Sequence, residues 1–406
     1  YSDACQSTPS QVRENLAKLW DEIKILTEPH AVELSLEPKP GSEPLLNKLN
    51  IFSKPSQLKV VFLHEYNAKN SAWVRGHEKG IEALKKEFPD RLIITNRENV
   101  SPEVDAEQII IGAGTEQLYS MLVQLLGRGK RYAAEDPGYS KIVRIYRSNQ
   151  AEVVSIPLDS AGLSVTALER AHADVVHISP SHHYPTGIVM PIARRQELLH
   201  WAEQGTDRYI LEDDYDSEFR FVGRPIPSLY STDENERVVY LNTFSKTIAP
   251  SIRISYMILP PKLLERYREK LGFYACTVSG FEQYTLAKFL EQGYFERHLG
   301  RMRNRYRQKR DQVITAFLQG PLAGRVKITG QDAGLHFLAE LQTSLPDDVL
   351  QHRAAEKGLR LAMLSDYYHD KKGVRQHTLV VNYSGLNLQH LPRALEYLAD
   401  IIKEGS

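Results

Sequence analysis

Short apolar runs alternate with amphipathic stretches along the central part of the chain. The runs QIIIG, DVVHIS, RYILED, RVVYLN and ISYMIL, all between residues 108 and 259, are typical of buried strands. Stretches such as TEQLYSMLVQLLG and RRQELLHWAEQG carry apolar residues at helical spacing. This alternation predicts an α/β domain with a largely parallel sheet that helices cover on both faces.

The same pattern divides the chain into four segments. Residues 1–56 are predicted as an amphipathic helix and a polar, proline-bearing connector, and residues 57–108 as an atypical strand and helix. Residues 109–318 form the predicted large domain, which ends in two long helical segments from about 261 to 318. Residues 319–406 mix the strands GLHFLAEL and TLVVNY with two helices, which predicts a smaller α+β domain.

Composition narrows the class of protein. The 51 Lys and Arg residues balance 51 Asp and Glu residues, so no net charge would recruit nucleic acid or an anionic membrane. Cys5 and Cys276 show no metal or redox spacing, and no apolar run approaches the roughly 18 residues that a membrane span needs. We therefore expect a cytoplasmic protein in a reducing compartment. The chain starts at Tyr1 rather than Met, which is compatible with a fragment.

Polar residues follow two of the predicted strands, at the edge where open α/β sheets bind ligands. After QIII, Gly112 and Gly114 open a helix whose free N–H groups suit a phosphate, although a plain tight turn fits equally. After RYILE come Asp213, Asp214 and Tyr215. Two adjacent carboxylates are suited to metal binding or acid–base chemistry, or one of them faces solvent.

A third strand leads into TFSKTIAPSIR, residues 243–253. This stretch offers two hydroxyls, an amine and a forked cation, from Thr243, Ser245, Lys246 and Arg253. A phosphate held by hydroxyls and arginine, beside a lysine free to form an imine, is what pyridoxal phosphate requires. Alone, Lys246 would be typical of a solvated surface. The cofactor interpretation depends on a carboxylate, Asp213, to keep the pyridine nitrogen protonated.

An aromatic residue follows a turn in EDPGYSK. Tyr139 comes directly after Pro137 and Gly138. Its ring is suited to stacking on a cofactor, or to packing in the core.

Five longer motifs resemble one family. EDPGY, SPSHHYPTGIVMP, LEDDYDSEFRF, NTFSKTIAPSIRISYMILPP and GLHFLAEL, in this order, are similar to the aminotransferase-like domain of the MocR (GntR-type) regulators, within the fold-type-I pyridoxal-phosphate-dependent enzymes. The resemblance covers about residues 105–400. It implies a Schiff base at Lys246, a pyridine-nitrogen partner in Asp213, a phenolic-oxygen contact from Tyr215 and ring stacking by Tyr139. It also implies a phosphate site formed by Thr115, Glu116, Thr243, Ser245 and Arg253.

The chain departs from the family pattern at several positions. Ser251 and Ile252 stand where the family usually has glycine and leucine before the arginine. Tyr184 stands where ordinary aminotransferases have an asparagine before PTG. Lys141 and Gly385 stand where some members have two arginines that hold a substrate carboxylate, so the substrates of those members are not implied.

The first hundred residues depart furthest. MocR regulators carry an N-terminal winged helix-turn-helix domain, which is not recognised in this segment. Residues 58–100 instead weakly resemble the start of a basic-membrane-protein type of ligand-binding domain, or GHEKGIEALKKEF is a degenerate form of the family's own helix before the sheet. One strand and one helix are too little for a binding cleft, so no transport function is predicted.

These observations predict two functions that use the same residues. One is a dimeric aminotransferase that acts on an amino acid or amine through Lys246. The alternative is the effector-sensing domain of a MocR-type regulator without its DNA-binding domain. We expect the arginine-rich stretch 297–310 to form a solvated helix face, and we expect no metal site, because histidines such as His64, His77 and His336 show no paired spacing.

Overall fold

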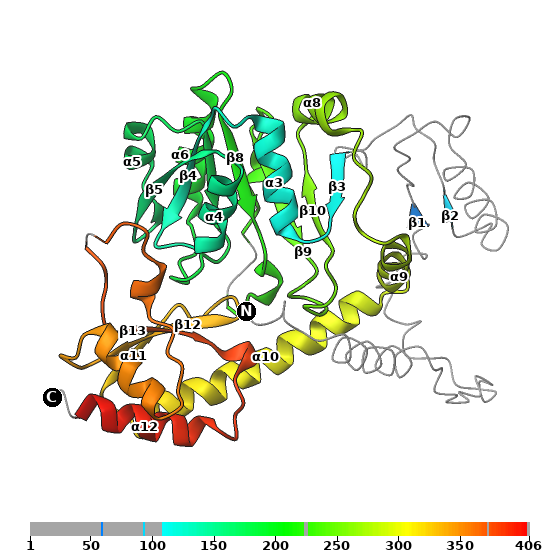
Figure 1. Cartoon of the computed structure of the whole chain (residues 1–406). Helices are drawn as coiled ribbons and strands as arrows, with labels where there is room; N and C mark the ends of the chain where they lie inside the picture. The colour runs from blue at the N-terminus through cyan, green and yellow to red at the C-terminus, as the bar shows by residue number, and fades with distance from the viewer. Residues whose placement is uncertain (1–57, 60–91, 94–107, 223–225, 372, 404–406) are drawn as a thin grey trace, which may run out of the picture. The chain divides into compact units, whose positions relative to one another are not determined.

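Figure 1 shows the computed structural model, which describes residues 58–59, 92–93, 108–222, 226–371 and 373–403. All of them belong to one unit of the chain, Leu58–Ser406. The predictions for residues 1–56 and most of those for residues 57–108 lie outside the described residues. Within the latter segment, β1 (Leu58–Lys59) pairs in parallel with β2 (Leu92–Ile93).

An eight-stranded mixed sheet forms the large domain, in the order β3-β10-β9-β8-β7-β4-β5-β6. The five strands from β9 to β5 are parallel, β10 runs antiparallel to both β3 and β9, and β6 runs antiparallel to β5. The largely parallel sheet is therefore confirmed. The strands are β3 (Ile109–Gly112), β4 (Arg131–Asp136), β5 (Glu152–Asp159), β6 (Gly162–Leu163), β7 (Val175–Ile178), β8 (Tyr209–Asp213), β9 (Val238–Thr243) and β10 (Ser255–Ile258).

Helices cover both faces of this sheet, as predicted. One face packs against α3 (Thr115–Leu126), α4 (Ser140–Ser148) and α8 (Pro261–Leu271), and the other against α5 (Val165–Arg170), α6 (Ile192–Glu203) and α7 (Leu229–Thr232). Strand β8 shows why the two faces are distinct: Leu211 belongs to the first core and Ile210 to the second. The same alternation directs Asp213 toward α3 and Glu212 toward α6 and α7.

Three helices, not the two predicted segments, follow β10. They are α8, α9 (Gly280–Glu291) and α10 (Tyr294–Gln319), and non-helical residues 272–279 and 292–293 separate them. In Figure 1, α10 extends from α9 to the small domain. The predicted solvated face on α10 is confirmed, because five of its arginines are exposed: Arg297, Arg301, Arg303, Arg305 and Arg307.

The small domain contains a three-stranded antiparallel sheet, in the order β11-β12-β13, packed against helices from α10 onward. Its elements are β11 (Val326–Thr329), β12 (His336–Leu341), α11 (Asp347–Glu356), β13 (Thr378–Asn382) and α12 (Leu391–Lys403). Short 3₁₀ turns occur at η3 (Ser217–Phe219), η4 (Leu364–Tyr367) and η5 (Tyr383–Gly385). Among the described helices, none combines the length and the apolar character needed to cross a bilayer.

Candidate functional site

Asp213 ends β8 as a buried carboxylate with one oxygen bonded and one oxygen unused. The Tyr119 hydroxyl of α3 donates to Oδ2 at 2.5 Å, and Nε2 of His177 lies 3.4 Å from the same oxygen. Oδ1 is buried and has no hydrogen-bond partner among the described residues. A buried acceptor without a partner is costly, so this oxygen is suited to a donor such as a protonated pyridine nitrogen.

Sequence reasoning missed both residues that hold this carboxylate. Burial, together with Asp213, raises the pKa of Tyr119, so its hydroxyl keeps the proton that it donates. His177 bonds the Tyr146 hydroxyl through Nδ1 at 2.6 Å, which fixes its ring in the core. A histidine inside the apolar run DVVHIS was the one available signal. Tyr119 offered none, because only the packing of α3 on β8 brings it to the site.

The start of α3 forms a cradle with Arg253. Gly114 precedes the helix at φ +95°, and a Cβ atom there would lie 2.8 Å from Cζ of Arg253, so a larger residue would displace the guanidinium. The N-cap residue is this glycine, so no N-cap side chain bonds the backbone N–H groups at the start of the helix. A helix N-terminus beside a guanidinium is an anion site of the kind that holds a phosphate.

A carboxylate with two cations stands beside the cradle. Oε1 of Glu116 accepts from Nζ of Lys141 at 2.6 Å, and Oε2 lies 3.7 Å from Nη2 of Arg253. The two cations outnumber the carboxylate, so the cradle keeps a net positive charge. Sequence reasoning placed Glu116 and Arg253 here but not Lys141.

The sheet register brings the predicted hydroxyl residues to the same edge. Ser255 of β10 stands opposite Gly112 of β3 on one side and Thr243 of β9 on the other. Its Oγ donates to Oγ1 of Thr243 at 2.8 Å. In the following loop, Oγ of Ser245 donates to the Ile252 carbonyl at 2.9 Å. The loop is thus tied back to the segment that leads to Arg253.

Lys246 lies in the loop after β9 with its side chain exposed. It forms no hydrogen bond or ion pair with another described residue. Its positive charge is one of several influences that lower the pKa of His336 in β12, after the dominant effect of burial. The amine therefore lies within electrostatic reach of the small domain.

The predicted aromatic residues lie where the two domains meet. The Tyr139 ring is 42% exposed and meets Tyr184 edge to face at 6.0 Å between centroids. The Tyr184 and Tyr367 hydroxyls are 2.7 Å apart, which joins the loop after β7 to η4 of the small domain. The Tyr215 hydroxyl donates to the His182 carbonyl at 2.9 Å.

Two buried ionisable side chains, at the end of β4 and in the loop after β7, are held in their neutral forms. Glu135 at the end of β4 accepts from the Ser179 N–H at 2.9 Å, and its Oε2 lies 3.4 Å from Nε2 of His183. Burial raises the pKa of Glu135 to about 8. Burial also lowers the pKa of His183 to about 3, and nearby His182 adds to that shift. A neutral acid beside a neutral imidazole avoids burying charge.

The structure also brings together three buried side chains that are far apart in sequence. His182, Asp216 and His336 offer atoms that all lie within 4.8 Å of one another. Nδ1 of His182 is 3.0 Å from Oδ2 of Asp216, and Nε2 of His336 donates to the Pro185 carbonyl at 3.1 Å. The first contact connects the loop after β7 with the loop after β8, and the second connects the loop after β7 with β12. The spacing of histidines along the chain gave no sign of this cluster.

The fold is that of the fold-type-I pyridoxal-phosphate-dependent transferases. The crystal structure of Pyrococcus horikoshii kynurenine aminotransferase, in complex with PMP and with KYN as substrates and KYA as products, matches with a TM-score of 0.65 and 26% identity, over 80% of this chain and 79% of that one. Within this class, the chain belongs to the aminotransferase class I and II family, whose model matches residues 67–369. Family membership also indicates pyridoxal phosphate as the cofactor, as predicted.

Curated relatives confirm the predicted resemblance to MocR-type regulators. The uncharacterized HTH-type transcriptional regulator YdeL of Bacillus subtilis (strain 168) is 36% identical over 72% of this chain and 62% of its own length. The probable rhizopine catabolism regulatory protein MocR of Rhizobium meliloti is 32% identical over 78% of this chain and 62% of its own. The chain thus spans about three fifths of the length of these relatives.

Proposed function

We propose that this chain binds pyridoxal phosphate between the start of α3 and the ends of β8 and β9, and that it acts as an aminotransferase on an amino acid or amine. The observation that carries the proposal is the unpaired, buried Oδ1 of Asp213, which lies on the same face of the sheet as the cradle of Gly114 and Arg253. When bound, the cofactor supplies an aldehyde and a ring that accepts electrons.

Each predicted residue has a definite role in this proposal. Asp213 keeps a proton on the ring nitrogen, and Tyr119 holds the carboxylate in place from its other oxygen. Arg253 and the first N–H groups of α3 bind the phosphate, with Thr115, Glu116, Thr243 and Ser245 around it. Lys246 would hold the cofactor covalently and, once released, would move a proton as a general base. Tyr139 and Tyr215 contact the ring from the domain junction.

A second candidate function rests on the same residues. The relatives at 32% and 36% identity are named as transcriptional regulators, and Lys141 and Gly385 replace the arginine pair that holds a substrate carboxylate in some family members. In this reading the chain binds the cofactor and an amine effector, and closure of the small domain reports occupancy. Contact with nucleic acid would then need a domain other than those described. In either reading we propose a homodimer that works in the cytoplasm.

Replacing Lys246 tests cofactor binding. The purified protein should be yellow with added pyridoxal phosphate, and borohydride should fix the cofactor on the peptide that contains Lys246. Lys246→Ala should lose both the imine absorption and the covalent label. Lys262→Ala is the matched control, because Lys262 is an exposed lysine at the start of α8, where its ammonium lies 3.9 Å from the Glu236 carboxylate. Equal labelling of the Lys246→Ala and Lys262→Ala proteins would refute the assignment.

A turnover assay separates the two candidate functions. The protein with its cofactor is mixed with single amino acids and a 2-oxo acid, and keto product is counted against protein. Many product molecules per site indicate an aminotransferase. A spectral change that stops after one equivalent of amine indicates a sensor.

A further inference from the structure

A polar cavity of about 250 Å³ lies beyond the end of β8, and Asp214 lines it. Asp213 and Asp214 are neighbours, but Asp213 faces α3, whereas Oδ2 of Asp214 accepts from the Tyr240 and Ser217 hydroxyls at 2.7 Å each. The cavity shares no lining residue with the predicted cofactor site. Its charged or titratable lining residues are His182, Asp214, Asp216, Glu218, Arg220 and Arg303.

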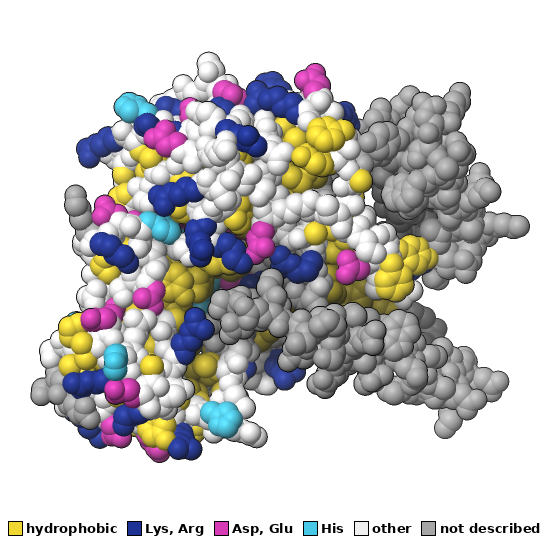
Figure 2. All heavy atoms as spheres, viewed as in Figure 1, with side chains coloured by type: hydrophobic (Ala, Val, Ile, Leu, Met, Phe, Trp, Pro, Cys, Tyr) yellow, Lys and Arg dark blue, Asp and Glu magenta, His cyan; other side chains and the backbone are white. Residues whose placement is uncertain are grey.

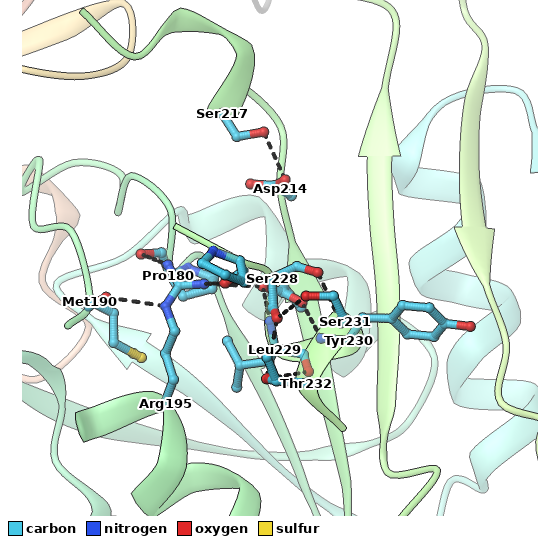
Figure 3. A network of polar contacts seen from close by, with 12 residues as sticks. Pro180, Met190, Arg195, Asp214, Ser217, Ser228, Leu229, Tyr230, Ser231 and Thr232 are labelled. Atoms are coloured by element: carbon cyan, nitrogen blue, oxygen red, sulfur yellow. Dashed lines mark hydrogen bonds and ion pairs between the residues drawn. The ribbon is translucent and has the colours of Figure 1, made fainter. Parts of the chain in front are cut away.

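A network of buried polar contacts fixes the walls of this cavity. The Arg195 guanidinium donates to the carbonyls of Pro180, Met190 and Pro227 at 2.8–3.1 Å (Figure 3). The carboxylate of Glu212 accepts from the first backbone N–H groups of α7. These bonds fix Pro180 beside Ser181, and Pro227 and Leu229 on either side of Ser228; both serines are further lining residues.

Among the lining side chains, both nitrogen and oxygen atoms lack hydrogen-bond partners. Nε2 of His182, Oδ1 of Asp214, Oε2 of Glu218 and Nε of Arg220 are buried and form no hydrogen bond among the described residues. Asp214 is only 6% exposed. Of the described ion pairs, none joins these carboxylates to Arg220 or Arg303, although all of them line one cavity. Arg303 donates through Nε to the backbone carbonyl of Glu218 and to no described carboxylate. The four buried atoms named above therefore lack a hydrogen-bond counterpart, and the cationic and anionic side chains are not paired with one another.

The charges and the size together define the missing partner. A metal ion would satisfy the carboxylates but not the two arginines. An anion would face Asp214 and Asp216, with Glu218 beside them, whose pKa burial raises to about 7. The volume is below the roughly 300–1,000 Å³ of sites for drug-sized ligands and well above the roughly 30 Å³ of one water molecule. A small zwitterion fits both conditions.

We propose that this cavity is a second amino-acid site, in which Asp214 and Asp216 bind the ammonium group and Arg220 and Arg303 bind the carboxylate. The site goes beyond the proposed cofactor chemistry, and it adjoins the cofactor side through one residue: Tyr215 precedes Asp216 and bonds the carbonyl of His182. An amino acid here is therefore placed to alter the position of Tyr215 and so the affinity of the cofactor site.

The test uses the whole chain with its cofactor fixed on Lys246 by borohydride, so that the first site cannot react with an amine. Each of the common L-amino acids is titrated by calorimetry. We expect one or a few of them to bind. If alanine binds, propionate, which lacks the ammonium group, and ethylamine, which lacks the carboxylate, should not bind. Asp214→Asn and Arg303→Gln should each weaken binding at least about tenfold, because each removes one charge contact. Arg144→Gln, on the exposed face of α4, is the matched control and should bind as the parent does.

Three results would overturn the proposal. One is that no amino acid binds the reduced protein, and another is that both variants bind with unchanged affinity while their melting temperatures match the parent. The third is a crystal soaked with the binding amino acid that shows only water or a metal ion in the cavity. Arg303 is exposed on α10, so its variant keeps the test valid if Asp214→Asn fails to fold. If no cofactor is fixed on Lys246, the proposed function fails, but the titration of the unreduced chain still tests this site.

Discussion

At the residue scale, one peptide unit separates two environments. Asp213 faces Tyr119 and His177 on one face of the sheet, and Asp214 faces Tyr240 and Ser217 on the other. Alternation along the strand produces this difference without any difference in residue type. Two adjacent aspartates can therefore serve two different ligands.

We expect Glu135→Gln to change how stability depends on pH. In the folded protein the pKa of Glu135 is about 8, against 4.5 for an unperturbed glutamate. Between these values the folded state keeps a proton that the unfolded state loses, so this residue lowers stability as pH rises from about 4.5 to 8. Glutamine does not titrate, so the free energy of unfolding of the variant should rise relative to that of the parent as pH increases across this window, by up to a few kcal/mol at about pH 8.

The measurement is urea unfolding of both proteins at several pH values. The contribution of His183 has the opposite sign, since its pKa of about 3 makes the folded state lose stability as pH falls below about 6.5. That contribution is common to both proteins and cancels in the difference. Parallel stability curves from about pH 5 to pH 8 would refute the prediction.

The sequence indicated the positions of two residues that the structure brings to the candidate site, while their roles stay predictions. The forked cation Arg253 does lie beside the glycine-opened helix, and Asp213 is buried at the end of its strand. The partners Tyr119 and Lys141 could not be found, because their roles depend on how α3 and α4 pack. The acid–imidazole pair of Glu135 and His183 was missed for the same reason.

At the element scale, the start of α3 depends on a single glycine. Gly114 has a backbone conformation, φ +95° and ψ 158°, that is essentially restricted to glycine. We expect Gly114→Ala to destabilise the fold by about 1–3 kcal/mol and to lower the affinity for pyridoxal phosphate at least about tenfold, because the added methyl group displaces Arg253. Thermal unfolding and titration of the visible absorption measure the two effects.

A glycine on a different helix supplies the control. Gly300 lies within α10, and a Cβ atom there meets no neighbour within 4 Å. Gly300→Ala should leave cofactor affinity unchanged and raise stability by roughly 0.5–1 kcal/mol, since alanine favours a helix interior. If the two variants bind the cofactor equally well, the cradle assignment is wrong.

Hydrophobic periodicity predicted the parallel strands and the main helices, because buried parallel strands are apolar throughout and surface helices are amphipathic. It did not predict β4 or β5, because each of these strands begins and ends with a charged residue. It also joined the helices between 261 and 318 into two segments, because the break at residues 272–279 contains a single glycine, Gly272, and no proline.

At the scale of the whole molecule, α9 presents apolar side chains that no described residue buries. None of its residues is buried, Phe281 is 70% exposed, and Tyr284 and Leu290 are exposed beside it. Figure 2 shows hydrophobic side chains at the place that α9 occupies in Figure 1. Exposed aromatic side chains gathered on one helix are typical of a protein interface.

We therefore expect Phe281→Glu to shift the protein from dimer to monomer in analytical ultracentrifugation, because a buried charge opposes association. Ile192→Glu, which also places an acid at an exposed apolar position, is the control and should remain dimeric. A parent protein that sediments as a monomer, or a Phe281→Glu protein that remains a dimer, would contradict this assignment of the interface.

The position of β10 between β3 and β9 also determines when the molecule can be completed during synthesis. Strand β3 pairs with β10, and Arg253 lies just before β10, yet the ribosome makes both about 140 residues after Gly114. At 5–20 residues per second the nascent chain waits roughly 7–30 s with the apolar strand Ile109–Gly112 unpaired. A growing chain of this protein therefore cannot complete the proposed site for its vitamin-derived cofactor before β10 emerges, and until then the apolar edge strand has no partner strand of its own.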